Sequence, residues 1–213
     1  MADTASTTIQ FTTIEELFKW INYVSLEISS PSKVHADKLY YQKHIPTIHP
    51  KVFSPKDFAE IEKERGLRRR KFRFRRYEAK SKILIIAIPT AAHEQLHHYL
   101  NDETRDEIVR MGLHDDWKSA GSTTFRPRGH PGGEGGEGDS PGCPDSQCSG
   151  GKDWPTLVIE AECSQSLDSL RRDMEWWFSA SDHQVKIVFL VELEESRGGI
   201  IPEKFWHHHD QEQ

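Results

Sequence analysis

The sequence predicts an α/β (α+β) fold in which a mixed central sheet is flanked by helices. Two strongly apolar strand-like segments, residues 156–162 and 185–193, enclose a stretch with helical periodicity. Strand–helix–strand units of this kind join parallel strands. A second pair of strand-like segments, residues 72–78 and 83–88, is joined by a short turn and predicts an antiparallel hairpin. The length of 213 residues fits one domain with appendages.

Composition limits the classes of function. Hydrophobic residues make up 35% and charged residues 29%, so part of the chain is expected outside the core. The net charge of −6 means that nucleic acid would have to bind through a local basic patch. No apolar run approaches the ~18 residues of a spanning helix. The N-terminus lacks a secretory signal and the three cysteines cannot form a disulfide framework, so we expect an intracellular protein, cytoplasmic or nuclear.

Residues 1–66 predict an N-terminal helical extension. Thr12 or Thr13 can cap a first helix, whose apolar side chains recur at helical spacing. Ser54, Pro55 and Asp57 carry the signals of a second helix start, and that helix is expected to end near residue 66.

Residues 67–195 are expected to form the core domain. Its elements in order are the hairpin, a helix over 91–111 that breaks near Asn101, a strand over 119–127, and the strand–helix–strand unit. The apolar run from Ile83 to Ile88 is typical of a strand covered on both faces. Residues 128–152, rich in glycine, predict a disordered insertion, and residues 196–213 predict a polar tail.

The sequence TLVIEAE contains the strongest chemical signal. Glu160 and Glu162 lie two residues apart on a predicted strand, so both project to one face. Two carboxylates near the interior of a sheet repel each other unless a cation lies between them, and a divalent cation with oxygen ligands meets that need. The alternative is that this end of the strand is solvated and both acids lie in water.

Several segments resemble the PD-(D/E)XK nuclease superfamily, in particular its restriction-endonuclease-like branch and fungal relatives within it. They are RYEAKSKILIIAIPTAAHEQLHHYL, STTFRP, and WPTLVIEAECSQSLDSLRRDMEWWFSASDHQVKIVFLVEL. The resemblance covers residues 69–193. It implies an αβββαβ core and Mg²⁺- or Mn²⁺-dependent hydrolysis of phosphodiester bonds in nucleic acid.

The family pattern assigns an acid and a lysine to the third core strand. Glu160 matches the acid, which would bind metal and take part in catalysis, while Glu162 stands where the lysine is expected. Glu162 can add a metal ligand but cannot replace an ammonium group. Arg172 on the next helix, or Lys186 near the last strand, is then expected to supply the displaced catalytic cation.

The acid of the second core strand has several candidates. Ser122 occupies its position if STTF is that strand, whereas Asp145 follows Pro144 in a literal Pro-Asp pair, and Asp139 and Glu78 are further candidate metal ligands. This departure from the pattern leaves an alternative open. The chain can be a catalytically degenerate nuclease fold that serves as a binding or interaction module.

The basic cluster between residues 65 and 76 suits contact with phosphates. We expect nucleic-acid binding there by Arg69, Arg70, Lys71, Arg73 and Arg75. The alternative is an edge strand that its charges protect from aggregation. No membrane partner is expected, and the sequence does not predict an oligomeric state.

The sequence His93-Glu94-Gln95-Leu96-His97 satisfies the H-E-x-x-H pattern of zinc metallopeptidases. A zinc peptidase is therefore a minor alternative, because no third ligand follows at a suitable spacing.

Overall fold

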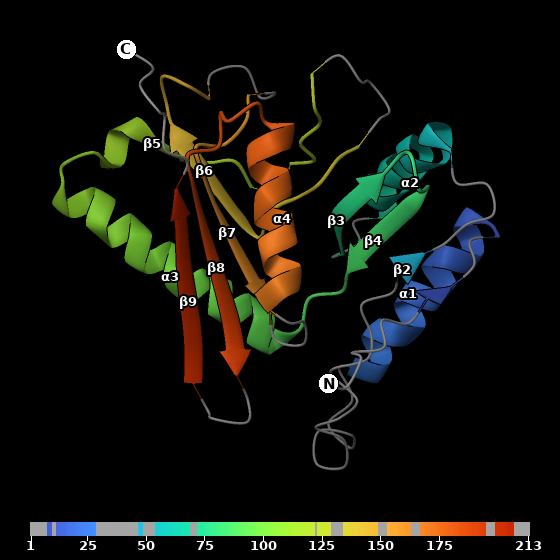
Figure 1. Ribbon diagram of the computed structural model, residues 1–213. Helices are drawn as coiled ribbons and strands as arrows, with labels where there is room; N and C mark the ends of the chain where they lie inside the picture. The colour runs from blue at the N-terminus through green and yellow to red at the C-terminus, as the bar shows by residue number, and fades with distance from the viewer. Residues whose placement is uncertain are drawn as a thin grey trace. The chain divides into compact units, whose positions relative to one another are not determined.

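The computed structural model describes residues 8–9, 12–28, 47–48, 54–68, 72–121, 123–128, 134–148, 153–162, 167–194 and 199–206 (Figure 1). Arg69, Arg70, Lys71 and Ser122 lie outside these residues. The chain divides into two compact units, one formed by residues 1–90 and 126–137, the other by residues 91–125 and 138–213. None of the described helices combines the length and apolar composition that crossing a lipid bilayer requires.

The described residues of the first unit form two helices and a four-stranded sheet. Its elements are β1 (Thr8–Ile9), α1 (Ile14–Ile28), β2 (Thr47–Ile48), α2 (Pro55–Arg68), β3 (Arg73–Glu78) and β4 (Ile83–Ala87). The sheet order is β1-β2-β4-β3, with β3 antiparallel to β4 as the hairpin prediction requires. The boundary predicted at residue 66 is wrong, because β2 pairs with β4 and so joins the N-terminal region to the hairpin.

Both helices begin where the capping residues predict. The Glu16 N–H donates to Thr13 Oγ1 at 3.2 Å at the start of α1. At the start of α2, the Asp57 N–H donates to Ser54 Oγ and the Ser54 N–H donates to Asp57 Oδ2, at 3.3 and 2.6 Å. This reciprocal pair satisfies backbone donors that the first turn leaves unpaired. α2 continues to Arg68, two residues beyond the predicted end.

Apolar side chains of α1 and α2 pack against one face of the hairpin. The buried members of this core are Leu17, Phe18, Ile21, Phe58, Ile61, Phe72, Phe74, Tyr77, Leu84 and Ile86. Within β4, Leu84 and Ile86 are fully buried while Ile83, Ile85 and Ala87 are only half-buried. The prediction that both faces of this strand are covered is therefore wrong, because the helices cover only the alternate positions.

Residues 134–137 of the glycine-rich segment belong to this unit. Tyr77 and Gly135 exchange two backbone hydrogen bonds, of 2.7 and 3.1 Å, and the Glu137 N–H donates to Phe74 O at 2.9 Å. The buried Glu137 carboxylate accepts two hydrogen bonds from the Arg65 guanidinium, at 2.6 and 2.7 Å. The predicted disorder is thus wrong for this stretch, since a bidentate ion pair holds it against β3.

Loss of the Arg65–Glu137 pair is expected to destabilise the protein. Glu137→Ala leaves a partly buried guanidinium without its carboxylate, so the free energy of unfolding should fall by about 3–5 kcal/mol. Glu62→Ala is the matched control, because Glu62 pairs with Arg126 at a more exposed position and should cost less than about 1 kcal/mol. Urea unfolding followed by circular dichroism measures both, and equal losses would contradict the expectation.

The second unit is a five-stranded sheet with a helix on each face. Its elements are α3 (Ala91–Arg110), a 3₁₀ turn η3 (His114–Asp116), β5 (Trp117–Ser119), β6 (Ser140–Pro144), β7 (Leu157–Glu162), α4 (Leu167–Ala180), β8 (Ile187–Glu194) and β9 (Gly199–Trp206). The sheet order is β5-β6-β7-β8-β9. β7 and β8 run parallel, as predicted, and the other neighbours are antiparallel.

Alternate residues of β7 face the two helices. Ile159 and Ala161 pack with Leu96 of α3, whereas Val158 packs with Leu170 and other apolar residues of α4. Figure 1 shows α4 in front of this sheet and α3 behind it. The elements from α3 to β8 therefore follow the order α-β-β-β-α-β. The predicted break near Asn101 is wrong, because α3 is one continuous helix.

Three of the strands differ from the sequence prediction. The strand expected over 119–127 is the short β5, which ends at Ser119. β6 comes from the segment predicted to be disordered, and β9 comes from the predicted polar tail. β9 pairs along the whole of β8, from Ile187↔Trp206 to Glu194↔Gly199, so long-range hydrogen bonding outweighs its weak local signal.

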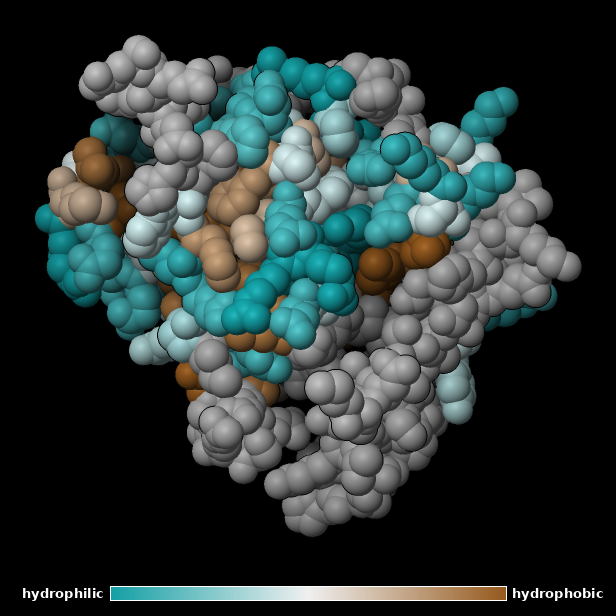
Figure 2. Space-filling view, in the orientation of Figure 1, coloured by the Kyte–Doolittle hydropathy of each residue, from teal (hydrophilic) through white to brown (hydrophobic). Residues whose placement is uncertain are grey.

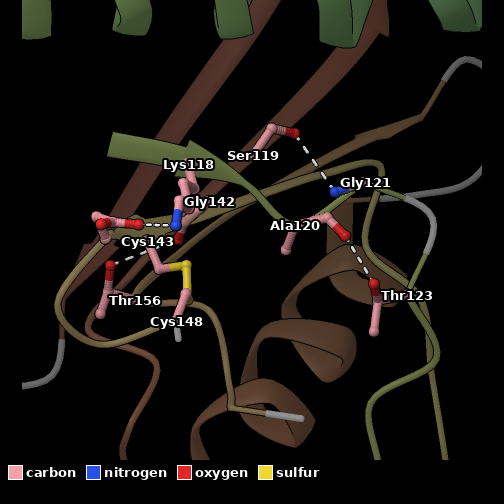
Figure 3. Close-up of a disulfide and its surroundings, with 10 residues drawn as sticks. Lys118, Ser119, Ala120, Gly121, Thr123, Gly142, Cys143, Cys148 and Thr156 are labelled. Carbon is pink, nitrogen blue, oxygen red and sulfur yellow. Dashed lines mark hydrogen bonds and ion pairs between the residues drawn. A yellow bond between two sulfur atoms is a disulfide. The ribbon is translucent and has the colours of Figure 1, made fainter. Parts of the chain in front are cut away.

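Gly142 in the middle of β6 leaves room for the Trp117 side chain of β5, and Figure 3 shows Gly142 beside Cys143 and Thr156. A Cβ at Gly142 would lie 2.5 Å from Cζ2 of Trp117 on β5. The Gly142 carbonyl accepts a hydrogen bond from the Thr156 N–H at 3.0 Å. Cys143 and Cys148, whose pairing the sequence did not predict, form a disulfide that closes the turn after β6.

Several large apolar side chains remain exposed at the C-terminal end of α3. Val109, Met111 and Leu113 are each at least 46% exposed. In the space-filling view of Figure 2, brown apolar surface is visible at the left, where this end of α3 lies. Scattered exposure of this kind is ordinary for protein surfaces.

Gly142→Ala is expected to lower the free energy of unfolding by about 1–3 kcal/mol, because the added methyl group overlaps the Trp117 indole. In a Trp117→Phe background the smaller ring removes the overlapping atoms, so the same change should cost less. Chemical unfolding of the four proteins measures the difference. An equal cost in both backgrounds would show that the indole is not the obstacle.

Candidate functional site

Glu160 and Glu162 are both buried on β7, each 5% exposed. The alternative that this end of the strand is solvated is therefore wrong. By strand alternation both side chains leave the backbone on the face that α4 covers. Two buried carboxylates repel each other and need positive groups or hydrogen-bond donors nearby.

Asp139 lies immediately before β6 and reaches the same part of β7. β6 pairs with β7 through Ser140↔Ile159, and Asp139 Oδ2 then accepts a 2.8 Å hydrogen bond from the Ala161 N–H. Glu160 and Glu162 are about 7 Å apart along the strand, and Asp139 reaches the backbone of Ala161 between them. Of the candidate acids in the second unit, Asp139 is the one that reaches the strand carrying the two glutamates.

His93, in the first turn of α3, provides a cation beside these acids. Its Nε2 lies 3.2 Å from Asp139 Oδ2 and its side chain is 12% exposed. Burial alone lowers the pKa of His93, but Asp139, Glu94 and Glu162 together raise that pKa to about 10. The imidazole is therefore protonated at neutral pH and offsets part of the negative charge.

His97 lies one helical turn further along α3 and is 1% exposed. Its Nδ1 lies 3.0 Å from Ser140 Oγ and its Nε2 lies 3.2 Å from Glu94 Oε1. Of the residues that the structure describes, His93, Glu94 and His97 form the one group of three His, Cys, Asp or Glu whose ligand atoms lie within 4.8 Å of one another. The H-E-x-x-H residues thus converge, but as a network that also involves Ser140.

Glu160 is turned towards α4. The Trp177 indole N–H donates a 2.5 Å hydrogen bond to Glu160 Oε1, and both groups are buried. Asp139 and Glu160 are therefore each held by a different donor, Ala161 N and Trp177 Nε1. This explains why the three carboxylates, although close in origin, do not form a group within 4.8 Å.

The other two candidate acids contact different partners. Asp145 follows the opposite end of β6, where it forms an ion pair with Lys118. Six residues of extended chain separate it from Asp139, or about 20 Å. Glu78 belongs to the first unit, where it accepts a hydrogen bond from Ser81 at 2.7 Å. The literal Pro-Asp pair is therefore wrong as a partner for Glu160.

Neither predicted cation on the second unit lies with the acids. Lys186 precedes β8, and its Nζ donates to His183 O at 2.7 Å. β8 begins opposite Leu157, so Lys186 lies at the other end of the sheet from Glu162. Arg172 is exposed on α4. The cation beside the acids is instead His93, which sequence reasoning assigned only to a zinc pattern.

The alternation predicted for the basic strand is confirmed for its described part. Phe72, just before β3, and Phe74 on β3 are buried, while Arg73 and Arg75 on β3 are half-buried. Binding of nucleic acid by this cluster stays a prediction.

The contribution of His93 to the free energy of unfolding should depend on pH. A histidine whose pKa rises on folding stabilises the folded protein most below its ordinary pKa of 6.5, and this contribution is lost as the pH rises towards about 10. Wild type should therefore exceed His93→Gln in unfolding free energy at pH 6 by an amount on the order of a few kcal/mol. Urea unfolding in EDTA at pH 6, 8 and 10 should show the difference shrinking, and a constant difference would contradict it.

Comparison with known proteins leaves the function to be inferred from this geometry. Neither a protein-family model nor a curated protein matches the sequence.

Proposed function

We propose that the second unit is a divalent-metal-dependent phosphodiesterase that acts on nucleic acid, with Asp139, Glu160 and Glu162 as its metal-binding carboxylates. One observation carries this proposal. The hydrogen bond from the Ala161 N–H to Asp139 brings an acid that immediately precedes β6 to the backbone between two acids of β7.

The topology around these acids supports the proposal. The order α-β-β-β-α-β is the layout that the resemblance to the PD-(D/E)XK superfamily implies. The sheet is mixed, with β5, β6 and β7 antiparallel and β8 parallel to β7. Asp139 immediately precedes the second strand of that layout, and Glu160 and Glu162 lie on the third, close to the positions that the same resemblance implies. A shared layout raises the expectation of nuclease chemistry without fixing it.

The donor set suits Mg²⁺ or Mn²⁺. Carboxylate oxygens are the ligands that these hard cations prefer, and two of the three acids, Glu160 and Glu162, are buried. A bound divalent cation would neutralise the phosphate and lower the pKa of the attacking water. The three carboxylates would hold the cation, while His93 supplies a positive charge of the protein itself next to Asp139.

Two features favour the second candidate, a nuclease fold retained as a binding module. Glu162 stands where the family has a lysine, and Glu160 already has a hydrogen-bond donor in Trp177. Such a module would bind nucleic acid through its basic residues without cleaving it. A zinc peptidase is less well supported, because the buried His97 contacts both Ser140 and Glu94 and a peptide substrate needs an open metal position.

Asp139→Asn tests the proposal against a matched control, Asp145→Asn, which changes the acid of the literal Pro-Asp pair. Asp139→Asn should weaken Mn²⁺ binding by roughly tenfold or more and abolish cleavage of plasmid or single-stranded DNA and RNA. Asp145→Asn should leave Mn²⁺ affinity unchanged. Titration calorimetry and cleavage assays with Mg²⁺, Mn²⁺ and EDTA measure these effects.

Three outcomes separate the candidates. Mn²⁺ binding without cleavage would favour the binding module. No Mn²⁺ binding by wild type would remove the metal site altogether, and equal losses in both variants would show that Asp139 has no special role.

A further inference from the structure

We propose that His93, Glu94 and His97 on α3 bind a Zn²⁺ ion that stabilises the packing of this helix against the start of β6. The inference goes beyond the proposed function and does not rest on it, because the ligands are not the acids of β7. Two imidazoles and one carboxylate are a ligand set that suits Zn²⁺, whereas Mg²⁺ and Mn²⁺ prefer oxygen ligands alone.

The first observation is that two imidazole nitrogens converge on one carboxylate oxygen. His93 Nδ1 lies 3.6 Å from Glu94 Oε1, and His97 Nε2 lies 3.2 Å from the same oxygen. One ligand atom from each of the three residues lies within 4.8 Å of the others. Two ligands of a tetrahedral zinc ion, each bound at about 2.0–2.1 Å, are about 3.4 Å apart. The imidazoles therefore approach Glu94 at the spacing of ligands around one ion.

The second observation is that the other nitrogen of each imidazole has an oxygen partner. His93 Nε2 lies 3.2 Å from Asp139 Oδ2, and His97 Nδ1 lies 3.0 Å from Ser140 Oγ. Histidines that bind a metal usually donate their other ring N–H to such an acceptor, which fixes the orientation of the ring. Zn²⁺ would replace the Nδ1 proton of His93 and leave the Nε2 proton on its bond to Asp139.

The third observation is the uneven burial of the three ligands. The side chains of His97 and His93 are 1% and 12% exposed, whereas that of Glu94 is 37% exposed. Two ligands are thus fixed inside the protein, while the third faces solvent, from which an ion can enter. Three protein ligands leave a fourth position for a water molecule.

This arrangement differs from the site of a zinc peptidase. In the H-E-x-x-H pattern the glutamate acts as the base that activates the metal-bound water. Here the Glu94 oxygen lies with both imidazoles and would itself bind the ion, so it is not left to serve as that base. Asp139 and Ser140, which hold the two imidazoles, lie at the start of β6. The bound ion would therefore stabilise the contact between α3 and β6 and would not hydrolyse peptides.

The test measures Zn²⁺ affinity of the full chain by competition with a chromophoric chelator, together with the visible absorption of the Co²⁺-loaded protein. Histidine runs bind metals, so every protein tested carries His207→Gln, His208→Gln and His209→Gln. Glu94→Gln removes the shared ligand at a partly exposed position. His98→Gln is the matched control, because it removes a neighbouring histidine of the same helix that is 60% exposed. Near-ultraviolet circular dichroism checks the packing of each variant.

Glu94→Gln should weaken Zn²⁺ binding by at least about a hundredfold and abolish the absorption of tetrahedral Co²⁺, whereas His98→Gln should leave the affinity within about threefold of the parent. Asp139→Asn, which acts through the orientation of His93, should weaken Zn²⁺ binding by roughly 10–100-fold. Absence of Zn²⁺ binding by the parent, or unchanged binding by Glu94→Gln, would overturn the site. Either result would leave the proposed function standing, because that function depends on Mn²⁺ binding by the acids of β7.

Discussion

The hydrogen bond from the Ala161 N–H to the Asp139 carboxylate is the contact on which the proposed site depends. The backbone pairing of β6 with β7 runs only as far as Ser140↔Ile159, and the Asp139 side chain then takes the Ala161 donor. An unpaired buried N–H is costly, so the fold itself requires an acceptor here. Because that acceptor is a carboxylate, the requirement of the sheet also brings an acidic side chain to the backbone between Glu160 and Glu162.

The long, strongly periodic elements could be predicted from the sequence, whereas those that depend on distant partners could not. Apolar periodicity or capping residues predict four elements that the structure contains, namely α1, α2, β7 and α4. β6, with the sequence SPGCP, has almost no strand propensity and exists because β5 and β7 pair with it on both sides. Composition also suggested disorder for Glu137, since it does not reveal that Arg65, seventy-two residues away, lies opposite.

The candidate site likewise has features that the local sequence predicts and features that depend on distant parts of the chain. The shared face of Glu160 and Glu162 follows from strand alternation alone, but their burial depends on the packing of α4. The choice between Asp139 and Asp145 could not be made locally, because it is set by the register of β6. The sequence identified His93 only as part of the H-E-x-x-H pattern. Its raised pKa depends on Asp139, which lies forty-six positions later in the chain.

The interleaving of the two units constrains how the chain can be made. The ribosome synthesises residues 1–90 before the rest of the first unit. Gly135, which pairs with Tyr77, and Glu137, which pairs with Arg65, emerge only after all of α3 and β5. Vectorial folding of the first unit cannot finish until then. Until then, the edge of β3 in the nascent chain has no partner from residues 134–137. An exposed strand edge can pair with other chains, so a chaperone would protect the nascent chain most during this interval.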